Sequence, residues 1–364
     1  LINFSDGRPL VIPLSGGYDS RLIACMLKKY NYKNVITFTY GKKNNREVLF
    51  SKKVANSLSL EWRYIEYSQQ KWREWYHTKE REEYYKYSDG LSVLPHLQDW
   101  PAVWELRNNN LIPKDSIFVP GHSLDFLAGS HLNEIFFSND YVSLKRLIKI
   151  IINKNFKYFK YPSYKCFSKK YYKIYRKISE QLNYDNEIIN TELACSMLEN
   201  WDWRERQSKY IINSVRVYEY WGYDWWLPLW NYNIMEFFSR IPKKLRENEI
   251  FYRKFVANLY SDVANISIKK AQKIPSTPND SWIMKKVKGY KIYWKIRKVY
   301  KDILSYVRKL FNQVRKIQPM GFYGGIDDRL YQKLKFKTNH ILGCYCLQYL
   351  DEIYREVQNI IEGK

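Results

Sequence analysis

The sequence of 364 residues is poor in cysteine, glycine and proline, and it has far fewer acidic than basic residues. Five scattered cysteines, 14 glycines and 12 prolines argue against a disulfide scaffold and against long low-complexity linkers. Asp and Glu number 37 against 61 Lys and Arg, a formal net charge of +24. No apolar run approaches the ~20 residues of a membrane-spanning helix, and no signal peptide is visible. We therefore expect a cytoplasmic protein with reduced thiols and no membrane span.

Aromatic and basic residues are abundant. Hydrophobic residues make up 45% of the chain and aromatic residues 18%, enough for the core of one large domain or two ordinary ones. The positive charge is typical of a protein whose partner carries phosphates, such as nucleic acid or an anionic membrane. The basic residues are spread along the chain, however, so we favour a compositional origin and do not expect a nucleic-acid partner. Because the chain begins with Leu1 and not Met, we expect a fragment or a processed domain.

Strand and helix signals alternate in the first third of the chain. Apolar, β-branched or aromatic runs predict four strands, over 10–14, 35–40, 62–67 and 117–119. Helical spacing predicts one helix that begins at Arg21 and another over 47–58. This alternation indicates an α/β fold with a parallel sheet and right-handed crossovers. From about residue 140 onward the pattern is mostly helical.

The most specific signal is the segment from Leu14 to Ser20, Leu-Ser-Gly-Gly-Tyr-Asp-Ser, directly after the first predicted strand. Its two glycines let the backbone approach an anion closely, and the following helix offers free N–H groups and the positive end of its dipole. Asp19 would repel phosphates unless a divalent cation lies between them, so we predict a pyrophosphate site with Mg²⁺. The predicted nucleotide-binding residues of this loop are Leu14, Ser15, Gly16, Gly17, Asp19 and Ser20.

This loop resembles the PP-loop of the ATP pyrophosphatases, which cleave ATP between its α- and β-phosphates. Over residues 8–280 the chain is similar to one branch of them, the synthetase domain of the asparagine synthetase family. The resemblance implies a parallel-sheet domain of the adenine nucleotide alpha hydrolase type with a mostly helical C-terminal part. Tyr40, before Gly41, takes the place of the residue beside the adenine.

A second stretch, Val119 to Gly129, is similar to the loop of that family that carries its second magnesium-binding aspartate. Asp125 matches that aspartate, and Pro120 and Gly121 match the pair that lines the nucleotide. The resemblance therefore implies Asp19 and Asp125 as Mg²⁺ ligands on two loops. We expect their carboxylates to converge on one crevice beside the glycines of the first loop; the alternative is that Asp125 only caps its own helix.

The sequence also departs from the family. His122 stands where the family has its catalytic Glu, and we take His122 and Asp125 as the candidate catalytic residues. The family's active-site lysine has no clean match, and its candidates are Lys254, Lys269, Lys270 and Lys273. Asp99 and Glu105 precede the fourth predicted strand and are further candidates for lining the cleft.

Taken as a member of this family, the chain is expected to be an ATP-dependent, AMP-forming carbon–nitrogen ligase. It would activate a small-molecule carboxylate as an acyl-adenylate for attack by ammonia or an amine, and a glutaminase domain upstream or in trans would supply ammonia. Two alternatives stay open: a tRNA- or sugar-modifying ATP pyrophosphatase, and a degenerate nucleotide-binding protein without catalysis.

We expect two units, an ATP pyrophosphatase domain over 1–280 and a basic helical extension over 281–364. In the extension, apolar residues between Lys295 and Lys316 recur at steps of three and four, which predicts a basic amphipathic helix. Such a helix suits a membrane surface or nucleic acid. We favour the other interpretation, that it packs on its own domain with a solvated basic face.

Overall fold

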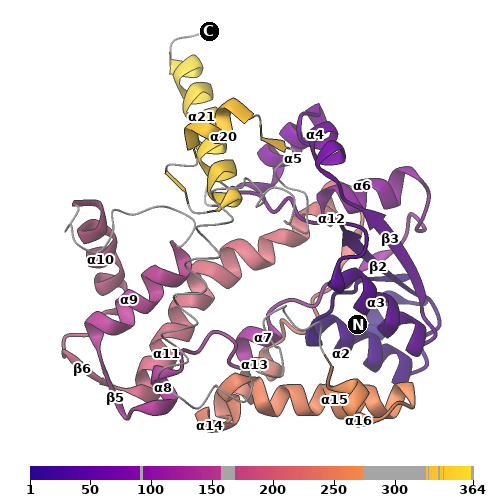
Figure 1. Ribbon diagram of the computed structural model, residues 1–364, viewed down its shortest axis with the longest axis horizontal. Helices are drawn as coiled ribbons and strands as arrows, with labels where there is room; N and C mark the ends of the chain where they lie inside the picture. The colour runs from indigo at the N-terminus through magenta and orange to yellow at the C-terminus, as the bar shows by residue number, and fades with distance from the viewer. Residues whose placement is uncertain are drawn as a thin grey trace.

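A five-stranded parallel sheet organises the structure, with the strand order β3-β2-β1-β4-β7. The computed structural model describes residues 1–90, 93–156, 169–273, 325–326, 328–334, 337–338 and 340–361. The strands span β1 Leu10–Pro13, β2 Val35–Gly41, β3 Glu61–Glu66, β4 Ile117–Phe118 and β7 Asp224–Trp225. The sheet and its helices form one lobe, and a smaller helical lobe lies beside it (Figure 1).

The central strand, β1, has apolar side chains on both faces because the sheet is covered on both sides. Val11 points into one core cluster with Phe38 and Phe118. Leu10 and Ile12 point into the other. This alternation with period two is the expected result of strand geometry, and it leaves the carboxyl end of β1 between its two parallel neighbours.

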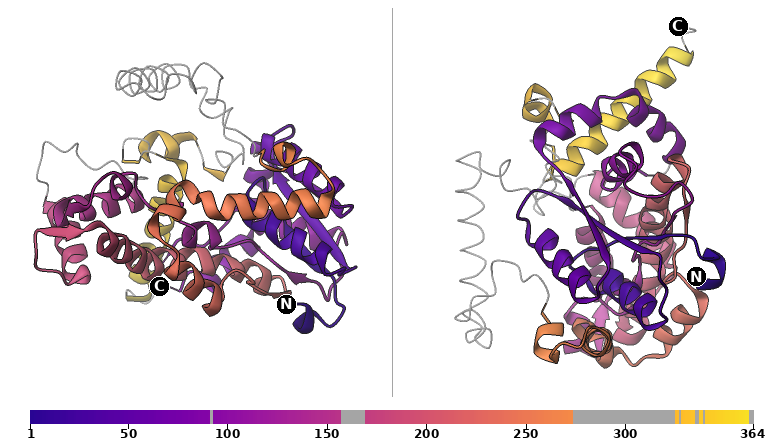
Figure 2. Two further views of the ribbon diagram at one scale, coloured as in Figure 1. Left: turned by 90° about the horizontal axis from the view of Figure 1, so that it is seen from below. Right: turned by 90° about the vertical axis from the view of Figure 1, so that its right-hand side faces the viewer.

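Helices cover the two faces of the sheet. One face carries α2 Tyr18–Lys29, α3 Arg46–Ser57, α15 Ile250–Ala264 and α16 Ile268–Ala271. The other carries α4 Gln69–Tyr76, α5 Lys79–Ser88, α6 Trp100–Asn108, α12 Arg216–Tyr220 and α21 Ile341–Ile361. Figure 2 shows α15 and α21 on opposite sides of the sheet. Short helices complete this lobe: α1 Ile2–Ser5, α7 Leu124–Leu127, α13 Tyr232–Arg240, α14 Lys243–Arg246, η3 Glu247–Glu249 and α20 Asp328–Leu334.

The second lobe has its own apolar core and an antiparallel strand pair. Its elements are α8 Ile135–Ser138, β5 Tyr141–Ser143, α9 Leu144–Asn155, α10 Lys169–Leu182, β6 Ile188–Asn190 and α11 Thr191–Asp202. A π-helix, η1 Trp203–Ile211, continues from α11 and leads through η2 Ile212–Val215 back to the sheet lobe. π-Helical segments are rare in proteins, and those that occur are often found at functional sites.

The α/β class and all four predicted strands are confirmed, with ends that shift by at most one residue. The first helix begins at Tyr18, three residues before the predicted start at Arg21. The later part of the chain is mostly helical, as expected, but it also holds β5, β6 and the fifth sheet strand β7. These strands have two or three residues each, too short for a periodic signal.

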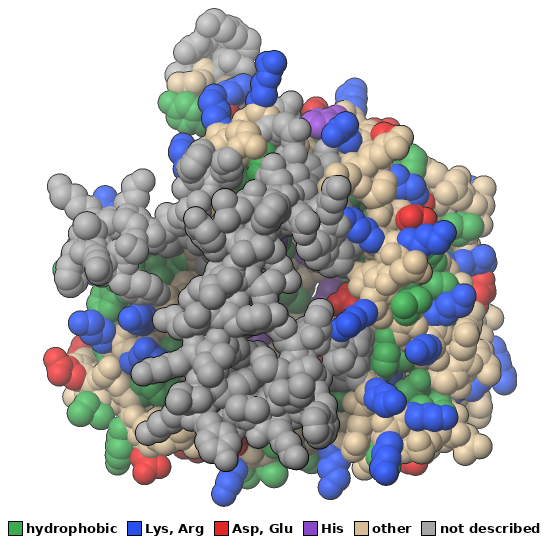
Figure 3. All heavy atoms as spheres, in the orientation of Figure 1, with side chains coloured by type: hydrophobic (Ala, Val, Ile, Leu, Met, Phe, Trp, Pro, Cys, Tyr) green, Lys and Arg blue, Asp and Glu red, His purple; other side chains and the backbone are tan. Residues whose placement is uncertain are grey.

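The expected domain boundary near residue 280 and the basic segment from Lys295 to Lys316 lie outside the described residues. After this segment, Ile341 and Tyr345 of α21 pack into the sheet lobe beside Tyr76. None of the helices in the described ranges combines the length and apolar character needed to cross a bilayer. None of the four cysteines among the described residues is in a disulfide. On the face in Figure 3, described lysine and arginine side chains are spread over both lobes.

Candidate nucleotide site at the end of the central strand

The loop from Ser15 to Ser20 connects β1 to α2 and is fastened by its own serines. Ser15 Oγ accepts a hydrogen bond from Gly17 N at 3.1 Å, and Ser20 Oγ accepts one from Ser15 N at 3.1 Å. The backbone N–H groups of Gly16, Tyr18 and Asp19 have no hydrogen-bond partner among the described residues. Unpaired N–H groups at the first turn of a 12-residue helix make this loop suited to an anion.

Gly17 lies at the N-cap of α2 with extended backbone, φ −76° and ψ 178°, so no left-handed conformation requires a glycine here. The constraint is space. A Cβ at this position would lie 3.2 Å from Ser15 Oγ, which must move to accommodate it. Leu14, also predicted as a site residue, has its side chain in the core and its N–H and C=O bonded to Phe38 O and Thr39 Oγ1. It can therefore shape the loop but has no free group for a ligand.

The loop that follows β4 packs directly against the first loop. A Cβ on Gly121 would lie 2.6 Å from Ser20 N and 3.0 Å from the carbonyl carbon of Asp19, so only glycine permits this approach. Pro120 before it is buried. Ser123, at the N-cap of α7, has φ +80°, and its Oγ donates to Gln207 Oε1 of the π-helix at 3.1 Å. A strained non-glycine residue of this kind is typical of functional loops.

Asp19 and Asp125 lie side by side, each at the second residue of its helix. Asp19 Oδ2 accepts a hydrogen bond from Asp125 N at 3.2 Å, and Asp19 Oδ1 accepts one from Tyr252 Oη of α15 at 2.6 Å. Asp125 Oδ2 accepts one from Ser130 Oγ at 3.1 Å. Ser123, not Asp125, is the N-cap residue of α7, so Asp125 does not cap its helix. Asp125 thus lies against the first loop, with its amide bonded to the Asp19 carboxylate; that both carboxylates hold Mg²⁺ in one crevice stays a prediction.

Asp19 is partly buried beside other acids. Burial, and secondly the negative charge of Asp125, raise the pKa of Asp19 to about 7, while the hydrogen bond from Tyr252 opposes the shift. Glu249 adds a further repulsive charge. A carboxyl group in such a place is stabilised in its charged form by a cation.

Mg²⁺ fits this donor set. It prefers hard oxygen ligands and is usually bound by one or two carboxylates together with phosphates and water. The described residues contain no cluster of three or more His, Cys, Asp and Glu that could hold a metal ion by itself. Asp19 and Asp125 would be the protein ligands of such an ion, and phosphate oxygens would supply further ligands.

His122 lies between Gly121 and the strained Ser123, with its Nε2 2.9 Å from Ser214 Oγ. Burial, and to a smaller extent the neighbouring His96, lower the pKa of His122 to about 4, although Asp99 and Asp125 oppose this. Ser214 Oγ donates its single proton to Ile211 O at 2.6 Å. We infer that His122 Nε2 carries the imidazole proton and that Nδ1 is a neutral acceptor.

Tyr40 is held by a buried carboxylate. Asp99, 4% exposed, accepts hydrogen bonds from Tyr40 Oη and, at 2.8 Å, from Tyr218 Oη. The ring of Tyr40 stacks on Tyr67, with centroids 5.0 Å apart. One face of Tyr40 is therefore covered by protein. Glu105, the other acid proposed for the cleft, forms an ion pair with Lys71 at 2.7 Å.

Sequence reasoning missed three residues of this region. Tyr252 is 233 residues from Asp19 in the chain, and Gln207 had no motif to mark it. Lys154 of α9 donates to the fully buried Asp202 at 2.9 Å and is close enough to Asp125 for their charges to interact. Burial lowers the pKa of Lys154. Lys154 is thus a cation near the acid pair, and it is not one of the four lysines proposed from the sequence.

The five-stranded parallel sheet with a Ser-Gly-Gly-x-Asp-Ser loop after its central strand is similar to the α/β nucleotide-binding domains of the PP-loop class. The comparison with protein families agrees: residues 4–86, from within α1 to within α5, match the family model described as asparagine synthase. The match contains the first loop but ends before the second, so the roles of residues beyond 86 do not follow from it.

Curated proteins yield no match to the chain. Among solved structures, the chain is similar to a predicted subunit of tRNA methyltransferase from Methanocaldococcus jannaschii. The identity is 17%, and the alignment covers 56% of this chain and 91% of that one, with a TM-score of 0.19. A likeness at this level supports no conclusion about fold or function.

Proposed function

We propose that the protein is an ATP-dependent ligase that activates a carboxylate as an acyl-adenylate and releases pyrophosphate. Ammonia or an amine then attacks the acyl carbon, an amide forms, and AMP leaves. The observation that carries this proposal is the loop Ser15–Ser20 at the carboxyl end of the central strand, with unpaired N–H groups and two convergent acids beside it. The asparagine synthase match over residues 4–86 supports the same class of chemistry.

The residues of the loop stabilise the charge that develops on the leaving pyrophosphate. The N–H groups of Gly16, Tyr18 and Asp19 and the dipole of α2 are already oriented, so they need no reorganisation during the reaction. Asp19 and Asp125 would hold Mg²⁺, which when bound neutralises phosphate charge. Tyr252 keeps the Asp19 carboxylate oriented through its hydroxyl.

His122 serves the second half of the reaction. An amine that attacks an acyl-adenylate must lose a proton, and the neutral Nδ1 of His122 is the acceptor that we assign to it. Its lowered pKa keeps it unprotonated at neutral pH. Ser214 fixes the ring through Nε2, so the residue acts from a set orientation.

The test is ATP–pyrophosphate exchange with the full chain, Mg²⁺ and a panel of carboxylic acids, followed by chromatography of the spent nucleotide. We expect exchange with one class of acid, and AMP as the product. Ammonium chloride should serve as the nitrogen donor without a glutaminase partner. ADP as the product, or ATP binding without exchange for any acid, would refute the ligase and leave a different or non-catalytic nucleotide-binding protein.

A tRNA- or sugar-modifying enzyme would share the AMP-forming half-reaction and differ in its acceptor. The net charge of +24 is the observation that favours an RNA acceptor. Filter binding of tRNA at low and moderate salt separates the two proposals. We expect weak binding of tRNA. Tight binding that falls steeply with salt, together with RNA-stimulated AMP release, would mean that the substrate is RNA and not a small-molecule carboxylate.

A further inference from the structure

Arg21 lies in the first two turns of α2, directly behind the phosphate loop, and its side chain is fully buried. Its Nη2 donates to Gly16 O at 3.2 Å, and its Nη1 donates to Ala271 O of α16 at 3.0 Å. The guanidinium thus joins the loop to a helix that is 250 residues away in the chain. Its Nε has no partner among the described residues.

No carboxylate of the described residues forms an ion pair with Arg21. Instead, the guanidinium carbon lies over three aromatic rings, 5.0 Å from the centroid of Tyr18, 4.8 Å from Phe50 and 5.2 Å from Tyr260. The rings and the two carbonyl oxygens stabilise the buried guanidinium, but none of them carries a full negative charge.

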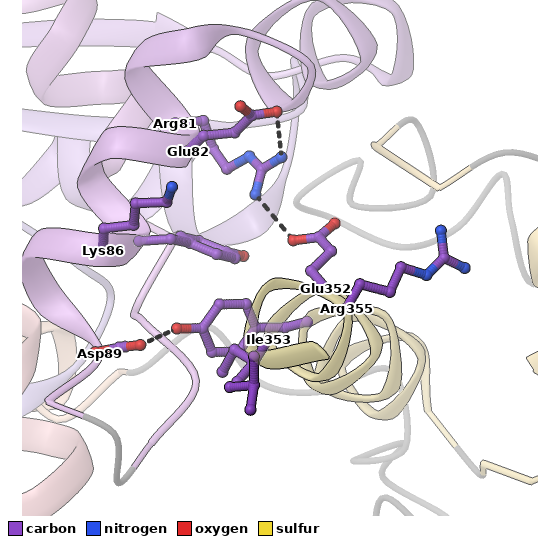
Figure 4. Close-up of a pocket in the computed structure, with 10 residues that line it drawn as sticks. Arg81, Glu82, Lys86, Asp89, Glu352, Ile353 and Arg355 are labelled. Carbon is purple, nitrogen blue, oxygen red and sulfur yellow. Dashed lines mark hydrogen bonds and ion pairs between the residues drawn. The ribbon is translucent and has the colours of Figure 1, made fainter. Parts of the chain in front are cut away.

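Another buried arginine shows the usual solution. Arg81 of α5 likewise lies over aromatic rings, those of Tyr76 and Tyr85, and it likewise donates to a carbonyl, here from its Nε to Tyr76 O. It differs from Arg21 because two carboxylates, from Glu82 and Glu352, each approach it to 3.6 Å beside a pocket of about 640 Å³ (Figure 4). Arg21 has the same packing but no such acid.

We propose that Arg21 is the built-in counter-charge of the phosphate loop, and that an anion bound at Ser15–Ser20 supplies the negative charge that this buried guanidinium lacks. Arg21 acts through its charge and does not contact the ligand; its hydrogen bond to Gly16 O holds the guanidinium behind the loop. In a site of low dielectric constant its attraction for an anion grows with the anion's charge. This inference rests on the proposed function insofar as the loop binds phosphates.

The experiment measures binding of inorganic pyrophosphate and of inorganic phosphate to the full chain, in the presence of Mg²⁺, by calorimetry and thermal shift. The variants are Arg21→Lys, which keeps the charge but cannot span both carbonyls, and Arg21→Met, which removes the charge at similar volume. Arg81→Met is the matched control, because it removes a buried arginine that already has acidic partners.

We expect Arg21→Met to lose at least tenfold in affinity for pyrophosphate and less for phosphate. Arg21→Lys should stay within about threefold of the wild type, and Arg81→Met should bind as the wild type does. Without ligand, Arg21→Met should fold and melt no lower than Arg81→Met, since it removes an unpaired charge.

Three results would overturn the inference. Equal losses in Arg21→Lys and Arg21→Met would mean that Arg21 only shapes the loop, and unchanged affinity in Arg21→Met would mean that its charge is not felt. Failure of Arg21→Met to fold would show that its charge is already compensated. Absence of pyrophosphate binding by the wild type would instead refute the phosphate loop itself, and with it the proposed function.

Discussion

Replacement of Asp19 by Asn tests the acid pair through stability, without any assay of turnover. An acid whose pKa is higher in the folded chain than in the unfolded chain binds its proton more tightly when folded. The stability linked to that proton is fully present below about pH 4 and is lost as the pH rises through 7. Asn carries no charge, and its amide can accept from Asp125 N and donate to Tyr252 Oη, so the two hydrogen bonds are kept.

The magnitude follows from the pKa of Asp19, about 7 against an ordinary value of 3.8. One pKa unit corresponds to about 1.4 kcal/mol, so the full shift corresponds to at most about 4 kcal/mol at pH 8. Solvent at this partly exposed side chain reduces that figure. We therefore expect Asp19→Asn to be more stable than the wild type by about 1–4 kcal/mol at pH 8 and equal to it near pH 4.

The assay is urea unfolding of both proteins at several pH values between 4 and 8, with and without Mg²⁺ and ATP. Ligand should stabilise the wild type at pH 8 and should have little effect on Asp19→Asn. Glu47→Gln is the matched control, since Glu47 is also the second residue of its helix but is exposed. A loss of stability in Asp19→Asn that is the same at pH 4 and pH 8 would refute the argument, because it would show that the folded chain accommodates the charge of Asp19 without cost.

Three further predictions follow from the same site. Because the pKa of His122 is lowered to about 4, the wild type should lose at most about 3 kcal/mol of stability between pH 6.5 and 4. This loss should be absent from the urea curves of His122→Gln, and an unchanged loss would assign it to another group. Gly17→Val should abolish the ATP-induced rise in melting temperature, since a Cβ already meets Ser15 Oγ at 3.2 Å, and an unchanged rise would contradict the phosphate-loop assignment. Gly121→Ala places a Cβ 2.6 Å from Ser20 N, so it should lower stability by about 1–3 kcal/mol and weaken ATP binding. Unchanged stability and ATP affinity in calorimetry would show that the two loops separate easily.

The sequence was sufficient to predict those features that depend on local patterns. The strands β1 to β3 carry runs of β-branched and aromatic residues, and the loop after β1 has a specific motif, so both could be located without a structure. By contrast, β7 consists of Asp224 and Trp225 alone and exists because β4 offers it a parallel edge. Its sequence has no strand signal.

Long-range partners account for most of what the sequence could not reveal at the site. Asp99 is a typical solvated acid by its sequence context, yet two tyrosines from distant segments surround its carboxylate. Lys154 and Tyr252 reach the acid pair from α9 and α15, and no spacing rule connects either residue to the first loop. Tertiary packing determines these contacts, so residue type and spacing carry little information about them.

The attachment of Asp19 to Asp125 and Tyr252 has a consequence for how the chain acquires its activity. The first 90 residues contain the whole loop and three strands, but as an isolated fragment they would lack the amide and the hydroxyl that hold the Asp19 carboxylate. During synthesis the loop emerges before α15, and it stays incomplete until α15 packs along α2. Under the proposed function, nucleotide would then bind only to chains in which α15 is in place, and the ligand would report that this part of the fold is complete.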